Sequence, residues 1–401
     1  MKLNTSLALK PKLFFYILIG MVWCQTILMQ YLRAVIMRFP IIGTAPDEVL
    51  TFLYIAIILL SISEIKFHMG DFIGILSMLL IFLISPIVFP DTFVFWKEEY
   101  TRFLLQVFPL YIIGVSIGNH KDDWENILHI LYILSVVSII VRIVYYYTNG
   151  TEMSQIQSLY AGDMDGAYNL LPHLCLVIYH VIKKATVFNV SVLAVGSVFL
   201  MFLGTRGAVL IEIICFVLVV LFFAKWKYKV LKIVLISTAV IVFLYSPLLE
   251  KTVLELYKLA DGLGLSVRIF DHFLNGELTD STGRDVIANT LYEFLSENSL
   301  GYGLYADRLL AGGAYAHKIY LELWIQFGVI LGTIIFAFIL IVPVRAFFKT
   351  KNDDIKGLLI ALYCSGVLKL FLSSSYLREG LFFMLLGLSV STIRIKEKCE
   401  K

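Results

Sequence analysis

The chain has 401 residues, of which 59% are hydrophobic and only 16% are charged, and its formal net charge is +3. Soluble proteins are roughly 45–50% apolar with glycine included and about 25% charged. This composition, with a mean hydropathy of +0.86, therefore excludes a soluble globular protein, a disordered chain and a small disulfide scaffold. The apolar runs are continuous rather than alternating, which argues against a β-barrel. We predict an all-α, polytopic membrane helix bundle that forms a single integral membrane domain over residues 1–401.

The first apolar run follows Lys10 and Lys12. It is too long for a signal peptide and lacks a small-residue cleavage site, so we interpret it as an uncleaved first span. A helical span needs about 20 residues. About twelve transmembrane helices are predicted in total, and several runs are short, as is typical of re-entrant segments. The runs are 13–31, 48–64, 72–89, 103–118, 126–147, 167–182, 187–203, 207–224, 230–249, 318–344, 357–372 and 377–393.

The lysines and arginines between these runs indicate the orientation of the bundle. Most of them fall on one side, which includes the basic segment 225–229 and the C-terminal tail. Because basic residues gather in cytoplasmic loops, the pattern predicts an even number of spans with both termini in the cytoplasm. The short outer loops hold Arg33, Arg38, Lys97, Arg102, Arg206 and Arg378.

One large extracytoplasmic loop is predicted at 250–314, and it is mixed polar and acidic. Long loops without structure are uncommon unless they are functional. Hydrophobic residues on helical spacing predict helices at 249–260 and 284–296. Ser281 or Thr282 is a candidate N-cap for the second helix, and Asn298 is its candidate end. We expect a small helical layer on the outer membrane surface.

The cysteines give no sign of a disulfide or a metal site. Four of the five lie inside apolar runs, and Cys399 lies in the C-terminal tail. Because there is no CxxC motif and no cluster of cysteine and histidine, we predict no disulfide, no metal and no cofactor.

Three helix starts on the predicted outer side carry a cation. Arg206 opens the eighth span within Gly204–Ala208, Arg284 opens the loop helix, and His317 with Lys318 opens the tenth span. A helix N-terminus carries partial positive charge, so a cation there is favourable when an anion lies between them. Taken singly, Arg206 can instead anchor its span among lipid headgroups, Arg284 can pair locally with Asp285, and His317 can be an interfacial histidine. Together they favour a site for a strongly anionic group such as a diphosphate.

Further ionisable residues lie inside apolar runs, where charge is a functional hypothesis by default. Arg142 and Lys369 lie near the outer ends of the fifth and eleventh spans and are expected to face the interior of the bundle. Glu212 lies about 9 Å below Arg206 at 1.5 Å per helical residue, with Lys369 or Arg206 as its candidate partner. Lys232 is expected to reach the cytoplasmic headgroups.

These residues resemble the O-antigen polymerase and O-antigen ligase superfamily of bacterial surface-polysaccharide enzymes. The motifs concentrate in 200–335. They are Gly204–Ala208, Arg284 followed by Gly301-Tyr302-Gly303, and His317 followed by Tyr320-Leu321-Glu322 and Phe327-Gly328. Two positions depart from the ligase motif, because Lys318 follows the histidine and the later glycine, Gly332, comes one position late.

The resemblance implies a membrane glycosyltransferase that uses a glycan linked to undecaprenyl diphosphate, on the outer face of the bacterial cytoplasmic membrane, without a nucleotide or a metal. Arg206 and Arg284 would stabilise the leaving diphosphate, and His317 would accept the proton of the attacking hydroxyl. These three residues are the predicted catalytic set. The predicted substrate-binding residues are Arg142, Lys318, Lys369, Tyr302 and Glu322.

A polysaccharide polymerase that joins lipid-linked repeat units, for example of a capsule, is the leading functional prediction. The alternatives are an O-antigen-type ligase, which moves a lipid-linked glycan to another acceptor, and a twelve-helix transporter. Transporters place broken helices and charges at the bilayer midplane, whereas the unusual charges here cluster at the outer end. The expected partners are membrane lipid, a flippase and a chain-length regulator, and no nucleic acid.

Overall fold

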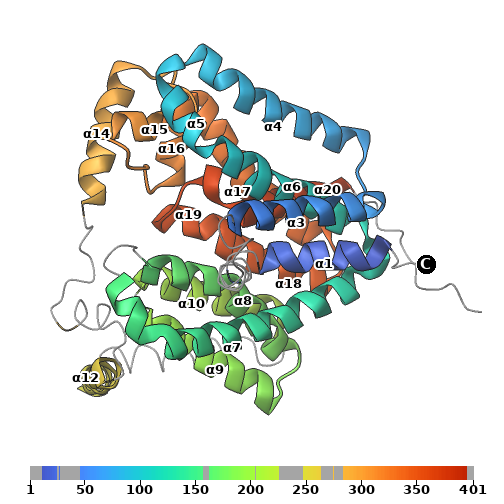
Figure 1. Cartoon of the computed structure of the whole chain (residues 1–401), viewed down its shortest axis with the longest axis vertical. Helices are drawn as coiled ribbons and strands as arrows, with labels where there is room; N and C mark the ends of the chain where they lie inside the picture. Colours follow the sequence, from blue (N-terminus) through green and yellow to red (C-terminus); the bar gives the residue numbers. More distant parts are fainter. Residues whose placement is uncertain are drawn as a thin grey trace, which may run out of the picture.

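The computed structural model describes residues 11–24, 46–156, 162–203, 205–224, 247–262 and 283–394, together with residues 27 and 274. Every regular element in these segments is helical (Figure 1), which confirms the all-α prediction. Within the described segments, six helical stretches are long and apolar enough to cross a membrane. They are Met69–Val88, Pro90–Asn119, Lys121–Tyr145, Arg206–Phe223, Val329–Lys349 and Asp353–Leu372. The expected number of about twelve spans stays a prediction, and most of the 230–249 run lies outside the described residues.

The helices follow in chain order. The first part contains α1 (Pro11–Trp23), α3 (Pro46–Ser61), α4 (Met69–Val88), α5 (Phe93–Arg102), the π-helical turn η3 (Phe103–Val107), α6 (Phe108–Asn119), α7 (Trp124–Ile156), α8 (Gly162–Lys183), α9 (Val187–Phe202) and α10 (Arg206–Phe223). The second part contains α12 (Pro247–Gly262), α14 (Arg284–Glu297), α15 (Ala306–Leu310), α16 (Ile319–Phe327), α17 (Val329–Lys349), α18 (Asp353–Leu362), the π-helical turn η5 (Tyr363–Leu368), α19 (Lys369–Leu372), η6 (Tyr376–Arg378) and α20 (Gly380–Arg394).

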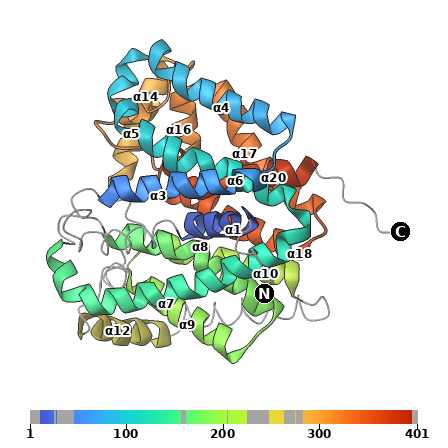
Figure 2. The ribbon, with the colours of Figure 1, turned by 45° about the vertical axis from the view of Figure 1, so that its right-hand side comes forward.

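Helices α6 and α20 pack closely against each other and lie side by side in both ribbon views (Figures 1 and 2). Glycines make the approach possible. A Cβ atom on Gly114 would lie 2.1 Å from the Met384 carbonyl oxygen, and one on Gly387 would lie 2.1 Å from the Tyr111 carbonyl oxygen. Small residues let helix backbones meet in membrane proteins. This contact fixes the segment before α20 beside α5 and η3.

The prediction of one helix over 318–344 is wrong. The helix breaks at Gly328, whose φ of 81° is accessible mainly to glycine. The break leaves α16 as a short helix before the membrane-length α17. The chain at Ser299 fills the gap, because Val329 N donates to Ser299 O over 3.0 Å. The loop therefore packs directly on the start of α17.

The expected helices of the 250–314 loop are confirmed as α12 and α14, and α15 is a further short turn. Arg284 is the first residue of α14, Gly283 is its N-cap with a φ of 81°, and Asn298 is its C-cap. The candidate caps Ser281 and Thr282 lie outside the described residues. A second small hydrophobic core joins α14, α15 and α16 through Ala288, Leu291, Leu295, Ala306, Leu321 and Ile325.

Polar contacts between distant segments collect at two ends of the bundle. At one end, the Lys12 Nζ atom lies 2.6 Å from Asp123, and the Arg394 guanidinium lies 2.6 Å from Asp71. These contacts tie the start of α1 to the start of α7, and the end of α20 to the start of α4. All four residues fall on one side of the predicted topology.

At the other end, Leu304 N donates to Ser85 Oγ over 2.9 Å, and Arg284 Nη1 donates to the Leu372 carbonyl oxygen over 2.7 Å. These four residues fall on the opposite side of the predicted topology. In Figure 2, α14 lies toward the left of the view and α18 toward the right. The contacts thus separate the helix ends into the same two groups as the predicted topology. Which of the two groups faces the cytoplasm stays a prediction.

The buried thiols are free. Cys24, Cys175, Cys215 and Cys364 are all buried and unpaired in the described part of the chain, and Cys399 lies outside it. Glu212 has a different partner from those expected, because Ser197 Oγ donates to its Oε1 over 2.6 Å. A hydroxyl is an adequate partner for a carboxyl group at this depth.

Candidate functional site

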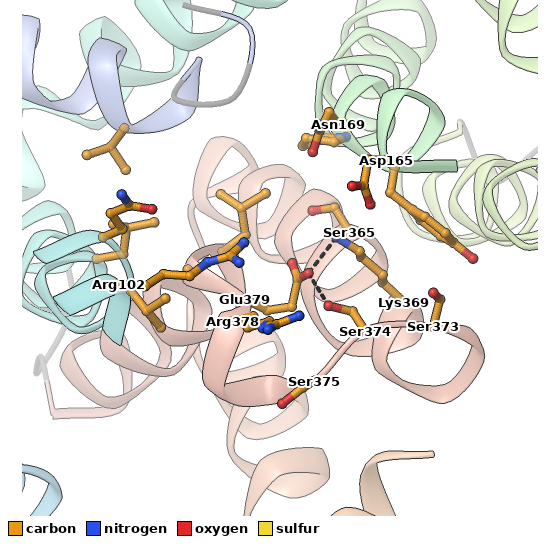
Figure 3. A pocket seen from close by; sticks show the side chains of 18 of the residues that line it. Arg102, Asp165, Asn169, Ser365, Lys369, Ser373, Ser374, Ser375, Arg378 and Glu379 are labelled. Carbon is orange, nitrogen blue, oxygen red and sulfur yellow. Dashed lines mark hydrogen bonds and ion pairs between the residues drawn. The ribbon is translucent and has the colours of Figure 1, made fainter. Parts of the chain in front are cut away.

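A cavity of about 430 Å³ opens at the end of the bundle that carries α14. Its walls come from the end of α1, from α5 and η3, from the start of α8, and from the chain between η5 and α20. Figure 3 shows its polar side chains, which include three cations, Arg102, Lys369 and Arg378, together with Asp165 and Glu379. The volume is in the usual range for small-molecule sites. A polar, charged cavity at this end of an apolar bundle is the candidate site.

Three consecutive serines, Ser373–Ser375, form a loop between α19 and η6, which we call the serine loop. Ser374 has a φ of 79°, a left-handed conformation that is unfavourable for any residue except glycine. Its Oγ atom donates to Glu379 Oε1 over 2.6 Å, and the Lys369 Nζ atom lies 2.5 Å from the same oxygen. The Lys369 Nζ atom also lies 5.2 Å from the centre of the Tyr168 ring. The lysine is thus held by a carboxylate and an aromatic face, and it points into the cavity (Figure 3).

A cluster of three arginines and one carboxylate lies on another wall. We call Arg102, Arg308, Arg378 and Glu99 the arginine cluster. Arg378 Nη2 donates to Glu99 Oε1, and Arg308 Nη1 lies 3.4 Å from the same oxygen. Arg102 forms no hydrogen bond or ion pair with any residue that the structure describes. Glu99 therefore contacts two of the three guanidinium groups, whereas Glu99, Glu379 and Asp165 act on Arg102 at longer range.

Two π-helical turns place these cations. Arg102 is the residue before η3, and Lys369 is the residue after η5. A π turn inserts one extra residue into a helix and occurs often at functional sites. Gln106 of η3 and Ser365 of η5 line the cavity. The extra residues rotate the helix faces, so that polar side chains of otherwise apolar helices meet in one space.

The helix start at Arg206 is packed against the wall of the cavity. Arg206 is the first residue of α10 and is half-buried. A Cβ atom on the next residue, Gly207, would lie 2.4 Å from the Tyr168 hydroxyl and 3.3 Å from the Leu372 side chain. Tyr168 lines the cavity, and Leu372 precedes the serine loop. The start of α10 therefore abuts the side of the cavity that holds Lys369.

The helix start at Arg284 reaches the same wall from the 250–314 loop. Arg284 Nη1 donates to the Leu372 carbonyl oxygen over 2.7 Å. This hydrogen bond uses one of the five donors of the guanidinium, and the remaining donors have no partner among the residues that the structure describes. The start of α10 and the Arg284 side chain thus meet at the same residue, Leu372.

The third predicted helix start, at His317, lies behind an aromatic residue of the wall. The His317 ring is stacked on Tyr315 with ring centres 4.0 Å apart, and Tyr315 lines the cavity. Burial and the nearby Arg284 charge lower the pKa of His317 to about 4. Its Nδ1 atom is buried without a hydrogen-bond partner in the described residues. The imidazole is therefore neutral at pH 7 and keeps a nitrogen that can take a proton.

Glu322 supports the serine loop from behind. It is only 2% exposed and does not line the cavity. It accepts hydrogen bonds from Ser375 Oγ and from the backbone N–H of Tyr376, which is 3.4 Å from Oε2. Burial and the neighbouring Asp307 carboxyl raise the pKa of Glu322. In this structure Glu322 therefore positions the serine loop, and its predicted contact with the substrate stays a prediction.

Lys318 and Tyr302 also lie away from the cavity lining. Lys318 is the N-cap of α16, beside Tyr292 of α14. The Tyr302 hydroxyl donates to the Phe294 carbonyl oxygen over 2.8 Å and belongs to the small loop core. The Tyr302 contact therefore joins the loop to α14, and the assignment of Lys318 and Tyr302 to substrate binding stays a prediction.

Arg142 and Lys369 both face the interior, as expected. Arg142 is 6% exposed, and its Nη2 atom would lie 2.5 Å from a Cβ on Gly166 of α8. Lys369 lines the cavity and pairs with Glu379. Of the eight predicted site residues, Lys369 is the one that lines the cavity directly.

Sequence reasoning missed Arg102, Arg378, Glu379 and the serine loop. Arg102 and Arg378 were counted only as basic residues of short outer loops. The available signal was local, because three serines followed by Arg-Glu interrupt an otherwise apolar C-terminal region. Such a polar insertion between two apolar runs is costly unless it faces protein or water.

Residues 191–337 match the family model described as O-antigen ligase. The matched range contains Arg206, Arg284 and His317, and it ends before Lys369 and the serine loop. The match confirms the resemblance to the O-antigen polymerase and ligase superfamily. No curated protein and no solved structure matches the chain.

Proposed function

We propose that this chain, a multi-pass membrane protein of the O-antigen polymerase and ligase type, polymerises glycan repeat units carried on undecaprenyl diphosphate, on the outer face of the bacterial cytoplasmic membrane. The observation that carries the proposal is the meeting of the start of α10 and the Arg284 guanidinium at Leu372, on the wall of a charged cavity. Both cations lie in the segment that matches the family model. Fixed cations at the edge of an apolar bundle suit a ligand with a diphosphate head and a lipid tail.

In the proposed reaction, Arg206 and Arg284 bind the diphosphate of the donor. A hydroxyl group of the acceptor sugar attacks the anomeric carbon of the donor glycan. The new C–O bond forms as the bond from that carbon to the diphosphate oxygen breaks, and the lipid diphosphate leaves with the electron pair. The two guanidinium groups and the positive end of α10 stabilise the charge that develops on the leaving oxygen.

His317 accepts the proton of the attacking hydroxyl in this proposal. Its imidazole is neutral because burial and Arg284 lower its pKa, and a neutral imidazole is the form that acts as a base. Tyr315 lies between His317 and the cavity, so a shift of this ring, or a proton relay along the Tyr315 hydroxyl, brings the two together. No metal or nucleotide takes part.

Lys369, Glu379 and the serine loop would position the sugar at the reacting end. The Glu379 carboxylate offers acceptors, and the serine hydroxyls and Lys369 offer donors. Arg142 would support the start of α8, which carries Tyr168. A flippase and a chain-length regulator of the same pathway are the proposed partners, and no nucleic acid is involved.

The second candidate function is a ligase, and the family description itself favours it. A ligase would use the same donor site and a different acceptor. Lys318 and Gly332, at positions where the ligase motif has other residues or spacing, favour the polymerase. A transporter fits less well, because the charged cavity lies at one end of the bundle rather than at its middle.

Deletion of the gene, followed by gel analysis of surface polysaccharide, tests the proposal. We expect the ladder of polymer lengths to disappear while single repeat units remain. An intact ladder that stays attached to the carrier lipid would instead identify a ligase. An unchanged surface polysaccharide would contradict both enzymes.

A further inference from the structure

Among the described residues, the arginine cluster holds guanidinium donors that have no hydrogen-bond acceptor. Arg102, Arg308 and Arg378 surround one carboxylate, Glu99, which contacts two of them. The Nη2 atom of Arg308 and the Nε atom of Arg378 are buried and have no hydrogen-bond partner among the described residues. Buried charges in proteins are normally paired and hydrogen-bonded. The unmet donors therefore indicate a place for an anion.

Arg102 connects the proposed anion site to the cavity. It lines the cavity and forms no ion pair within the described part of the chain. In Figure 3, its guanidinium points toward Arg378 and Glu379 across the cavity. Arg378 is 33% exposed in its side chain and lines the cavity as well. Two guanidinium groups thus face one space from different elements, which is the arrangement that binds a phosphate or a carboxylate.

The cluster is separate from the proposed donor cations. Figure 3 places Arg102 and Arg378 toward one side of the cavity and Ser373 toward the other, with Glu379 between them. Arg284 binds the main chain at Leu372, next to Ser373. The two cationic groups therefore flank the Lys369–Glu379 ion pair. A reaction that joins two glycans would bring one from each side.

We propose that Arg102 and Arg378 bind an anionic group of the acceptor glycan. This inference rests on the proposed glycan transfer and deepens it, because it assigns the charge of the second substrate. The anion is either the phosphate of a second carrier lipid or the carboxylate of an acidic sugar. Both present several acceptor oxygens, to which a guanidinium group can donate two parallel hydrogen bonds. A neutral acceptor would leave the Arg102 guanidinium without a hydrogen-bonded anion, since Glu99, Glu379 and Asp165 act on it only at longer range.

Direct binding tests the inference in the purified full-length protein, held in nanodiscs of phosphatidylcholine. The probes are farnesyl diphosphate, which represents the carrier lipid, and trigalacturonic acid, which represents an acidic glycan. Arg102→Gln is the first variant, because Arg102 has no ion pair to lose and the fold has no reason to change. Lys97→Gln is its matched control, since it removes the same charge from an exposed site on the same helix, α5.

We expect the dissociation constant of one probe to rise at least about tenfold in Arg102→Gln and to be unchanged in Lys97→Gln, as follows from the loss of a charge-assisted hydrogen bond. The probe that responds identifies the source of the anion. The double variant Glu99→Gln, Arg378→Gln should weaken binding of the same probe. The Glu99 substitution is included because Arg378→Gln alone would take away the hydrogen-bond partner of the Glu99 carboxylate. Arg284→Ala should retain the binding that depends on Arg102.

The inference is overturned if both probes bind Arg102→Gln and the Glu99→Gln, Arg378→Gln variant as they bind the wild type. It is also overturned if neither probe binds the wild type. Failure of the proposed function would be seen in a different experiment. In that case deletion of the gene would leave the polysaccharide ladder intact, whether or not the probes bind.

Discussion

Arg284, the first residue of α14, donates a hydrogen bond of 2.7 Å to the main-chain carbonyl of Leu372, at the edge of the serine loop. A residue of the 250–314 loop thereby touches the wall of a cavity that is formed by the helix bundle. A Cβ atom on Gly207, the second residue of α10, would lie 3.3 Å from the side chain of the same leucine. Leu372 is therefore the point at which the loop, the bundle and the proposed donor site are joined.

The first prediction concerns the charge of Arg284. Arg284→Ala should lower the rate of glycan transfer by about 10²–10³-fold, the usual cost of losing a group that stabilises a developing anion. Arg284→Lys should recover only part of the rate, because lysine lacks the planar fork that binds two oxygens. Polymer formed in a gene-deletion strain, normalised to the amount of membrane-inserted protein, measures the effect. Lys258→Ala, an exposed cation on α12, is the control and should keep the wild-type ladder.

The second prediction concerns pH and His317. The pKa of this histidine is lowered from 6.5 to about 4, so the basic form prevails down to about pH 4. We expect no loss of transfer rate between pH 7 and pH 5.5 from this group. An exposed histidine would instead lose half of its base form near pH 6.5. A rate that falls by half near pH 6.5 in the wild type, and that still does so in Glu379→Gln and in Tyr315→Phe, would contradict the assignment.

The sign of the stability effect follows from the same shift. Below pH 6.5 the unfolded chain binds a proton at this histidine, whereas the folded protein does not until about pH 4. His317 therefore lowers the free energy of unfolding as the pH falls from 6.5 to 4. His317→Gln should lose less stability than the wild type over this interval, as measured by thermal unfolding in detergent at each pH.

The third prediction concerns Glu322, whose pKa is raised by burial and by Asp307. A group of this kind stabilises the fold in its protonated form, and its contribution is lost as the pH rises through the folded-state pKa. Glu322→Gln resembles the protonated form and should keep both the stability of the protein and the rate of glycan transfer. At alkaline pH this variant should lose less stability than the wild type. Glu322→Ala should leave Ser375 and Tyr376 without their acceptor and reduce both. Equal behaviour of the two variants would show that the hydrogen bonds to the serine loop are unimportant.

The fourth prediction separates backbone strain from the hydrogen bond at Ser374. Both Ser374→Gly and Ser374→Ala remove the hydroxyl that donates to Glu379. Only glycine relieves the left-handed backbone, whose φ is 79°. We expect Ser374→Ala to be less stable than Ser374→Gly by about 1 kcal/mol, while both variants transfer glycan more slowly than the wild type. Thermal unfolding and the transfer assay, run on the same preparations, give the two readouts.

The fifth prediction concerns the contact between α6 and α20. Gly114→Ala should destabilise the protein by about 1–3 kcal/mol, because the new methyl group overlaps the Met384 carbonyl. Gly262→Ala, at the end of α12, adds a methyl group in open space and is the control. The ratio of folded to aggregated protein after heating measures the difference. Equal ratios for the two variants would mean that the helices separate without cost.

Much of the framework was predictable because it rests on local rules. Arg206, Arg284 and Lys318 stand at helix starts, where the chain changes from polar to apolar spacing. The break at Gly328 was missed because the apolar residues run on across it. Only the backbone of Ser299 and its neighbours, packed into the gap, makes the break favourable.

The cavity was not predictable in the same way. Arg102 and Arg378 are 276 positions apart, and each on its own resembles a headgroup anchor. Their meeting depends on two π-helical turns, which rotate α5 and the segment before α19 by one residue. It also depends on the close approach of α6 to α20 through Gly114. None of these features has a signature in hydrophobic spacing.

The most direct test of the proposed reaction uses proteoliposomes that contain the purified protein and lipid-linked repeat units, which are extracted from the gene-deletion strain. The products are separated by chain length, and free undecaprenyl diphosphate is measured in parallel. We predict a ladder of polymers with one undecaprenyl diphosphate released for each linkage formed, and loss of both in Arg206→Ala combined with Arg284→Ala. Repeat units that cross the membrane or stay single, with no diphosphate released, would contradict the account.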